Sequence, residues 1–84
     1  MKDEEIQAAI LETAYKVWKQ KEVKPFVLFE KSKDWGVEEK ELNRNLSYLV
    51  QKGWMEKVGY KAGHHLVRIT DTGIDEYRRT HKDS

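Results

Sequence analysis

The polar side chains between residues 38 and 52 are the first candidates for a chemical role, because their types suit contacts with nucleic acid. At about 100° per residue, they lie opposite a predicted buried stripe of Leu42, Leu46, Leu49 and Val50. The polar face carries Lys40, Arg44, Ser47 and Gln51, with Tyr48 at its edge and Asn43 and Asn45 flanking it. Arginine and lysine donate to guanine, glutamine can bind adenine through two hydrogen bonds, and serine or tyrosine reaches phosphates. A helix with this face could read base edges, although any solvated helix face carries similar residues.

A second group of candidates lies on a predicted β-hairpin that follows this helix, and consists of Lys57, Tyr60, Lys61 and Arg68. The hairpin and the helix together carry an excess of basic over acidic residues, which the rest of the chain lacks. Residues 40–68 contain six basic and two acidic side chains, whereas residues 1–39 contain seven basic and nine acidic ones. Because phosphate contacts supply most non-specific affinity for DNA, this local excess favours a DNA-facing surface more than the net charge of +1 suggests. An exposed polar turn that contains an aromatic residue is the simpler interpretation of the hairpin tip.

Three acidic residues oppose the DNA interpretation. Glu38, Glu39 and Glu41 crowd the first turn of the same predicted helix, at the end that usually inserts deepest into a groove. Their carboxylates stabilise the helix dipole by about 0.3–1 kcal/mol, but phosphates would repel them. The same acidic turn would suit a surface that binds protein instead of nucleic acid.

Metal binding and catalysis find little support in the residue pattern. His64 and His65 are neighbours on a predicted strand, where successive side chains point to opposite faces and cannot chelate one ion. The chain lacks nucleophile-elbow, dinucleotide-binding and phosphate-loop glycine motifs, and it contains no cysteine. We therefore expect no enzyme activity, no metal and no cofactor. The three tryptophans could stack on bases, but their positions on apolar faces or at helix ends favour a role in the core.

The composition predicts one small soluble domain. The chain has 84 residues, of which 38% are hydrophobic and 37% are charged. No apolar run approaches the roughly 18 residues of a membrane span, and the N-terminus is acidic where a secretory signal would be basic. The absence of cysteine agrees with a reducing compartment. These features lead us to expect a cytoplasmic location with no membrane partner.

The order of predicted elements is three helices, a hairpin and a final helix, all within one domain that spans residues 1–84. Helices are expected at about 3–20, 25–34 and 38–52, strands at about 54–58 and 64–69, and a closing helix at about 71–80. Pro25 is interpreted as the first position of the second helix, where its missing N–H is harmless. Thr72 and Asp75 fit a capping box at the start of the last helix.

Two strings within this order resemble the winged helix-turn-helix superfamily. LNRNLSYLVQKGWMEKV is similar to the recognition helix and first wing strand, and LVRITDTGIDEYRR to the second wing strand with its closing helix. Such strings are common in bacterial and archaeal regulators of the multiple-antibiotic-resistance, arsenic-repressor and phenolic-acid-repressor types. The resemblance covers about residues 5–80. It implies an α+β fold with a three-helix core, a two-stranded β-hairpin wing and a short C-terminal helix.

The resemblance also implies partners and roles. Helix 38–52 would read the major groove of double-stranded DNA, and the basic wing would contact phosphates, as in a small transcriptional regulator. The alternative is a winged-helix module that binds protein without DNA, since this fold serves both purposes. Many relatives dimerise through added helices, so we expect a weak homodimer or a monomer that uses a protein partner, with Leu11 and Trp18 as exposed apolar residues that could form the contact.

Overall fold

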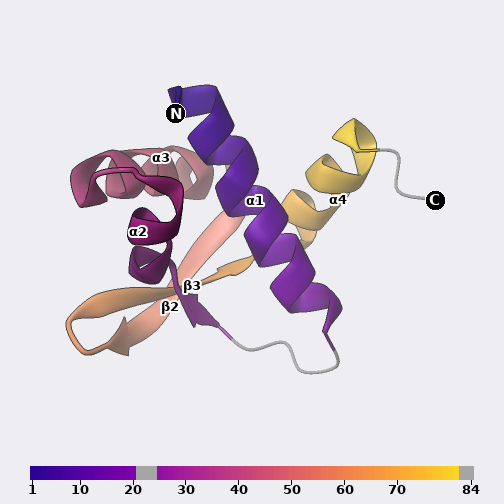
Figure 1. Ribbon diagram of the computed structural model, residues 1–84. Helices are drawn as coiled ribbons and strands as arrows, with labels where there is room; N and C mark the ends of the chain where they lie inside the picture. The colour runs from indigo at the N-terminus through magenta and orange to yellow at the C-terminus, as the bar shows by residue number, and fades with distance from the viewer. Residues whose placement is uncertain (21–24, 82–84) are drawn as a thin grey trace.

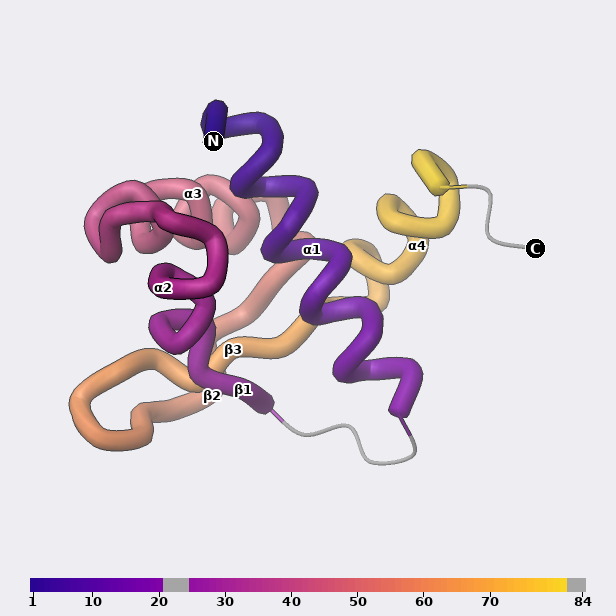
Figure 2. The backbone as a smooth tube through the Cα atoms, in the orientation of Figure 1, coloured from indigo at the N-terminus to yellow at the C-terminus, as the bar shows by residue number. Residues whose placement is uncertain are grey.

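The computed structural model describes residues 1–20 and 25–81, which form an α+β arrangement (Figure 1). The elements are α1 (Asp3–Lys19), β1 (Phe26–Val27), the 3-10 turn η1 (Leu28–Glu30), α2 (Lys31–Trp35), α3 (Glu39–Gln51), β2 (Met55–Lys61), β3 (His64–Ile69) and α4 (Asp71–Thr80). The strands form an antiparallel sheet in the order β1-β3-β2. Helix α1 crosses the molecule between α3 and α4 and contacts both of them as well as β3 (Figure 2).

Helix α1 forms where the sequence predicts it and supplies the centre of the core. Ile6, Ile10 and Ala14 recur at helical spacing and are almost completely buried. Acidic residues occupy the first turn, and Lys16 and Lys19 occupy the last, so both ends complement the helix dipole. The helix ends at Lys19, one residue before the predicted limit.

The predicted second helix at 25–34 is wrong in its first half. Pro25 lies outside any helix, and the next two residues form strand β1, in which Phe26 pairs with Val67 and Val27 with Leu66. The free edge of β3 provides hydrogen-bond partners for these residues, whose aromatic and β-branched side chains favour a strand. The sheet consequently has three strands instead of the predicted two. Helix α2 begins only at Lys31 and ends at Trp35, and Gly36 caps it in the left-handed conformation (φ 63°).

Helix α3 and the hairpin follow the predicted order with shifted limits. Leu42, Leu46 and Leu49 are buried, and the helix occupies all but the end residues of the predicted range. Strand β2 extends three residues past its predicted end, because its pairing with β3 continues beyond a β-bulge between Lys57 and Gly59 as far as Lys61. The predicted five-residue loop therefore shrinks to a tight turn, in which Ala62 and Gly63 have positive φ.

Helix α4 closes the domain against α1 and the start of β2. The rings of Tyr15 and Tyr77 stack with their centroids 4.2 Å apart and join the two helices. The N-cap is Thr70 and not the predicted Thr72, because the Thr70 hydroxyl oxygen accepts a hydrogen bond from the Gly73 N–H at 3.0 Å. All three tryptophans are partly buried and pack against the core, in agreement with the structural interpretation of these residues. The expectation that Leu11 and Trp18 are exposed contacts is wrong, because Leu11 is buried in the core and Trp18 packs against it.

Gly73 gives a stability prediction, because the backbone of the α3–β2 connection passes directly beside it. A Cβ at this position would lie 2.1 Å from the carbonyl oxygen of Trp54 and 2.8 Å from Cγ1 of Ile69. We expect Gly73→Ala to lower the free energy of unfolding by about 1–3 kcal/mol through overpacking, although alanine is the better helix former. Urea denaturation measures the change. The control Thr72→Ala, at an exposed position in the same turn, should stay within about 0.5 kcal/mol of the parent, and equal effects of the two substitutions would contradict the prediction.

Candidate nucleic-acid interface

The polar face of α3 is exposed along its whole length. All six predicted α3 site residues are exposed to solvent, namely Lys40, Asn43, Arg44, Ser47, Tyr48 and Gln51. The leucines that alternate with them hold the helix against α1 and the sheet, so the side chains of the polar face project outward together. Asn45, which flanks this face in the sequence, is instead buried at 2% exposure.

The register of the hairpin decides which of its side chains lie on the face that packs toward the core. Val67 and Ile69 of β3 are buried, so the residues opposite them on β2 share their face of the sheet. Lys57 is opposite Val67. Past the bulge, Tyr60 is opposite His65, and their ring centroids are 4.6 Å apart. Tyr60 is 70% exposed, and Lys61 is exposed beside it at the turn, so this end of the hairpin carries an accessible aromatic ring and a cation.

The structure separates Arg68 from the other predicted site residues. Arg68 lies between Val67 and Ile69 on β3, so its side chain points to the opposite face of the sheet. There it is paired across the strands with Glu56, whose carboxylate accepts a hydrogen bond from the Arg68 guanidinium. Both side chains line a cavity of about 470 Å³ beside Trp18 and the start of α4. Arg68 therefore does not add to the charge of the surface that α3 and Tyr60 share.

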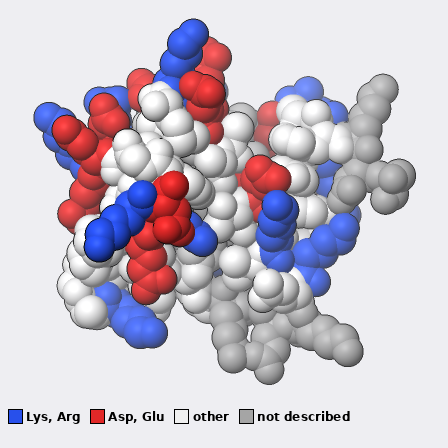
Figure 3. Space-filling view, viewed as in Figure 1, with Lys and Arg blue, Asp and Glu red and all other residues white. Residues whose placement is uncertain are grey.

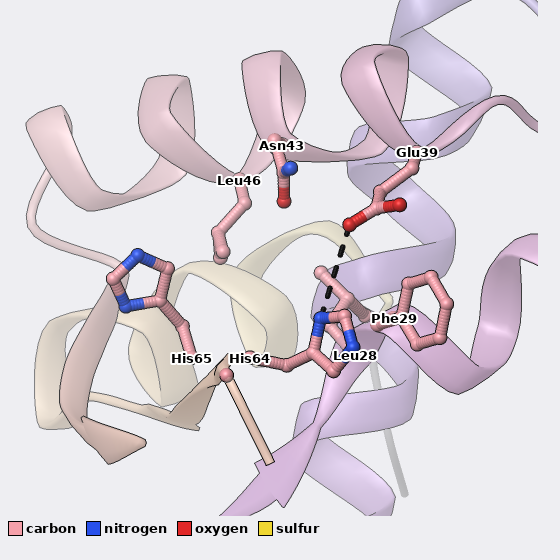
Figure 4. A pocket seen from close by; sticks show the side chains of 8 residues that line it. Leu28, Phe29, Glu39, Asn43, Leu46, His64 and His65 are labelled. Atoms are coloured by element: carbon pink, nitrogen blue, oxygen red, sulfur yellow. Dashed lines mark ion pairs between the residues drawn. The ribbon is translucent and has the colours of Figure 1, made fainter. Parts of the chain in front are cut away.

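A pocket of about 220 Å³ lies where α3 meets the hairpin (Figure 4). Glu39 and Asn43 enter it from α3, His64 and His65 from β3, and Leu28 and Phe29 from η1. The Phe29 and His64 rings stack at 4.0 Å, and His64 Nδ1 is 3.8 Å from Glu39 Oε1. The residues that line the pocket thus link α3 to the hairpin, because Glu39 of α3 approaches His64 and Phe29 stacks on the same ring.

Sequence reasoning missed two members of this pocket. Phe29 is 38% exposed, and its ring covers His64. Glu39 was interpreted as part of the acidic first turn of the helix, without a contact to the hairpin. No local spacing reveals either contact, because η1, α3 and β3 come together only through the tertiary fold.

Asp3 of α1 contacts the polar face of α3, which the sequence did not indicate. Arg44 Nη2 donates a hydrogen bond to Asp3 Oδ1 at 2.8 Å, and Asn45 Nδ2 donates to the same oxygen at 3.3 Å. The Arg44 guanidinium, followed by the Asn45 amide, lowers the pKa of the Asp3 carboxyl below its ordinary value of 3.8. Both members of the ion pair remain more than half exposed, so solvent weakens their attraction.

The remaining cations of α3 and the hairpin are accessible. In the described part of the chain, Lys40, Lys57 and Lys61 have no carboxylate partner, and Lys52 lies over the Tyr48 ring at 5.5 Å from its centroid. Acidic residues occupy the same first turn of α3 as Lys40. The view in Figure 3 shows red side chains at the edge where α3 begins, the position of Glu38, Glu39 and Glu41. The surface is thus a mixture of charges with a modest excess of accessible lysine.

Two further findings concern the described residues, 1–20 and 25–81. These residues contain no group of three or more His, Asp and Glu side chains placed to hold a metal ion. Within the same ranges, no helix is long and apolar enough to cross a membrane.

Comparison with known proteins identifies a fold relative. No family model matches the chain, and no curated protein matches it significantly. The chain is similar in structure to a proposed DNA-binding protein from Ralstonia eutropha JMP134, whose crystal structure it matches with a TM-score of 0.76. The match covers 92% of this chain and 95% of the other at 16% sequence identity. At this identity the likeness shows a shared fold.

The Asp3–Arg44 pair predicts a dependence of stability on pH. Because the pKa of Asp3 is lower in the folded protein, its contribution to stability is complete above the unfolded pKa, about 3.8, and is lost as the pH falls through the folded value. We expect Asp3→Asn to flatten the loss of stability below about pH 4 while changing its slope little near neutral pH.

Urea denaturation followed by tryptophan fluorescence at a series of pH values measures this slope. Glu4→Gln is the matched control, because Glu4 is exposed in the same turn and does not contact Arg44. Parallel stability curves for the parent and Asp3→Asn below pH 4 would contradict the assignment.

Proposed function

We propose that this chain is a winged helix-turn-helix protein that binds double-stranded DNA and regulates transcription in the cytoplasm, without catalysis or a cofactor. Helices α2 and α3 would form the helix-turn-helix, and β2 with β3 the wing. The order of helices and strands and the antiparallel sheet support this assignment. The fold shared with a protein named for proposed DNA binding agrees with it.

The observation that carries the proposal is the exposed polar face of α3 beside the hairpin that bears Lys57, Tyr60 and Lys61. The major groove of B-DNA is about 12 Å wide and admits one helix. In this arrangement Lys40, Arg44, Ser47 and Gln51 would face base edges, with Asn43 and Tyr48 at the borders of the contact.

The hairpin would hold the helix in register on the DNA. Among the described residues, no carboxylate pairs with the ammonium group of Lys57 or Lys61, so neither has to leave such a partner before it meets a phosphate. The exposed ring of Tyr60 can pack on sugar or donate its hydroxyl to the backbone. Arg68 is left out of the proposed contact, because it faces the other side of the sheet and is paired with Glu56.

A second candidate function is binding to protein, either a different partner or a second copy in a weak homodimer. The ion pairs Arg44–Asp3 and Arg68–Glu56 neutralise two of the six cations that the sequence assigns to residues 40–68. The acidic residues at the start of α3 lower the local potential further. A surface with this balance of charge suits a polar protein partner as well as a phosphate backbone.

The lysine pair of the hairpin provides the test of DNA binding. We expect Lys57→Gln with Lys61→Gln to weaken binding to a mixed-sequence duplex and to reduce the slope of log affinity against log salt by about 0.9 for each phosphate that is no longer neutralised. Fluorescence anisotropy at several salt concentrations measures both quantities. The matched control removes two cations elsewhere, with Lys16→Gln on α1 and Arg79→Gln on α4.

The outcomes separate the two candidate functions. DNA binding is supported if the hairpin variant loses affinity and salt dependence while the control keeps both. Equal reductions in both variants would indicate attraction by overall charge without a defined interface. Absence of binding by the parent chain at low salt, together with a dimer in sedimentation at tens of micromolar, would favour the protein-binding alternative.

A further inference from the structure

The contact between α1 and α3 contains a buried amide whose hydrogen-bonding groups are all used. Asn45 Nδ2 donates to the Glu41 carbonyl oxygen at 2.9 Å and to Asp3 Oδ1 at 3.3 Å. Asn45 Oδ1 accepts from Gln7 Nε2 at 2.9 Å. Because the amide is 2% exposed, rotating it away would leave buried polar groups without partners. The network therefore holds the Asp3 carboxylate at one position beside the polar face of α3.

Arg44 extends this network to the surface. Its Nη2 donates to the same Asp3 oxygen at 2.8 Å, which uses one of the five N–H groups of the guanidinium. Within the described residues, the other four N–H groups have no protein acceptor, and the side chain is 58% exposed. The hydrogen bond to Asp3 already restricts the rotamers of Arg44 in the free protein. The side chain therefore loses less conformational entropy when its remaining N–H groups bind a ligand.

We infer that Asp3 is a positioning residue for base recognition, which orients Arg44 toward a guanine and keeps it from binding phosphates indiscriminately. This inference rests on the proposed DNA-binding function. A bidentate contact with guanine N7 and O6 needs two N–H groups on one side of the guanidinium, and the pair with Asp3 leaves enough of them available. A phosphate would have to compete with the Asp3 carboxylate for the same cation, so the pair disfavours non-specific contacts.

The inference predicts that loss of the Asp3 carboxylate raises the affinity for mixed-sequence DNA and lowers the preference for the recognised site. Removing the Asp3 charge frees Arg44 to reach phosphates, so Asp3→Asn should bind mixed-sequence duplex more tightly and with a salt slope steeper by about 0.9. The same change should weaken the preference for guanine at one position of the site. A merely structural role for Asp3 would reduce both affinities together.

A selection from random duplexes about 20 base pairs long, roughly two helical turns, identifies the preferred site of the full chain. Fluorescence anisotropy then compares this duplex with versions in which each guanine is replaced by adenine. For the parent, one replacement should reduce affinity by about 5- to 150-fold, the range of a good bidentate contact. Arg44→Gln should abolish this difference, and Asp3→Asn should reduce it to a few-fold.

Two further variants separate the effect of the position of the Asp3 carboxylate from the effect of its negative charge. Glu4→Gln removes one negative charge from the same turn without touching Arg44, and should retain the discrimination of the parent. Asp3→Glu keeps the charge but moves the carboxylate by one methylene, and should lose discrimination without gaining affinity for mixed-sequence DNA. Thermal unfolding of each variant shows that it is folded under the assay conditions.

The results distinguish this inference from the function on which it rests. If the parent binds no DNA, both fail. If the parent binds a preferred site and Asp3→Asn discriminates as well as the parent, the positioning role fails while DNA binding stands. A loss of discrimination in Glu4→Gln as large as that in Asp3→Asn would also overturn the positioning role, because it would reflect charge alone.

Discussion

The orientation of α3 on α1 is the constraint on which the exposed surface depends. The leucines of α3 pack on Ile6 and Ile10 of α1, but such apolar contacts are non-directional and tolerate rotation of a helix about its axis. The buried Asn45 amide is directional, and its bonds to Gln7 and Asp3 fit only one rotation. In the described residues, every buried side-chain nitrogen and oxygen has a partner. The leucine stripe thus selects which face of α3 is buried, and the small polar network fixes the rotation of the helix within that constraint.

Strand β1 restricts the orientation of the hairpin in a similar way, because it pairs with β3. A two-stranded ribbon in water is marginally stable and twists freely, whereas β1 pairs with β3 and links the hairpin to η1. Phe29 then stacks on His64, and Glu39 of α3 approaches the same imidazole. The hairpin is therefore connected to the polar face of α3 through the pocket between them. If both elements contact one DNA duplex, this connection limits their relative movement before binding and lowers the entropy lost on association.

The accuracy of sequence-based prediction differed between local and non-local features. Helix α3 was predictable because its leucine stripe and following glycine act within a few residues. Strand β1 was not, since a two-residue strand has no periodicity and exists only through its pairing with β3. The position of Arg68 could have been inferred from its alternation with Val67 and Ile69, a signal that local charge counting ignored. The Asp3–Arg44 pair spans 41 residues, and no spacing rule connects them.

The mixed charge of the surface has a consequence for recognition. At physiological salt, charges separated by more than about 8 Å are largely screened, so Glu38, Glu39 and Glu41 affect mainly those cations that lie beside them. An interface of this kind gains little from long-range attraction and depends on groups that meet the DNA directly. A single module of this size buries about 600–1,000 Å² on DNA, which restricts the number of such groups. Tight binding by this chain would therefore require either well-oriented base contacts within one module or a second copy on an adjacent half-site, and the network that holds Arg44 favours the former.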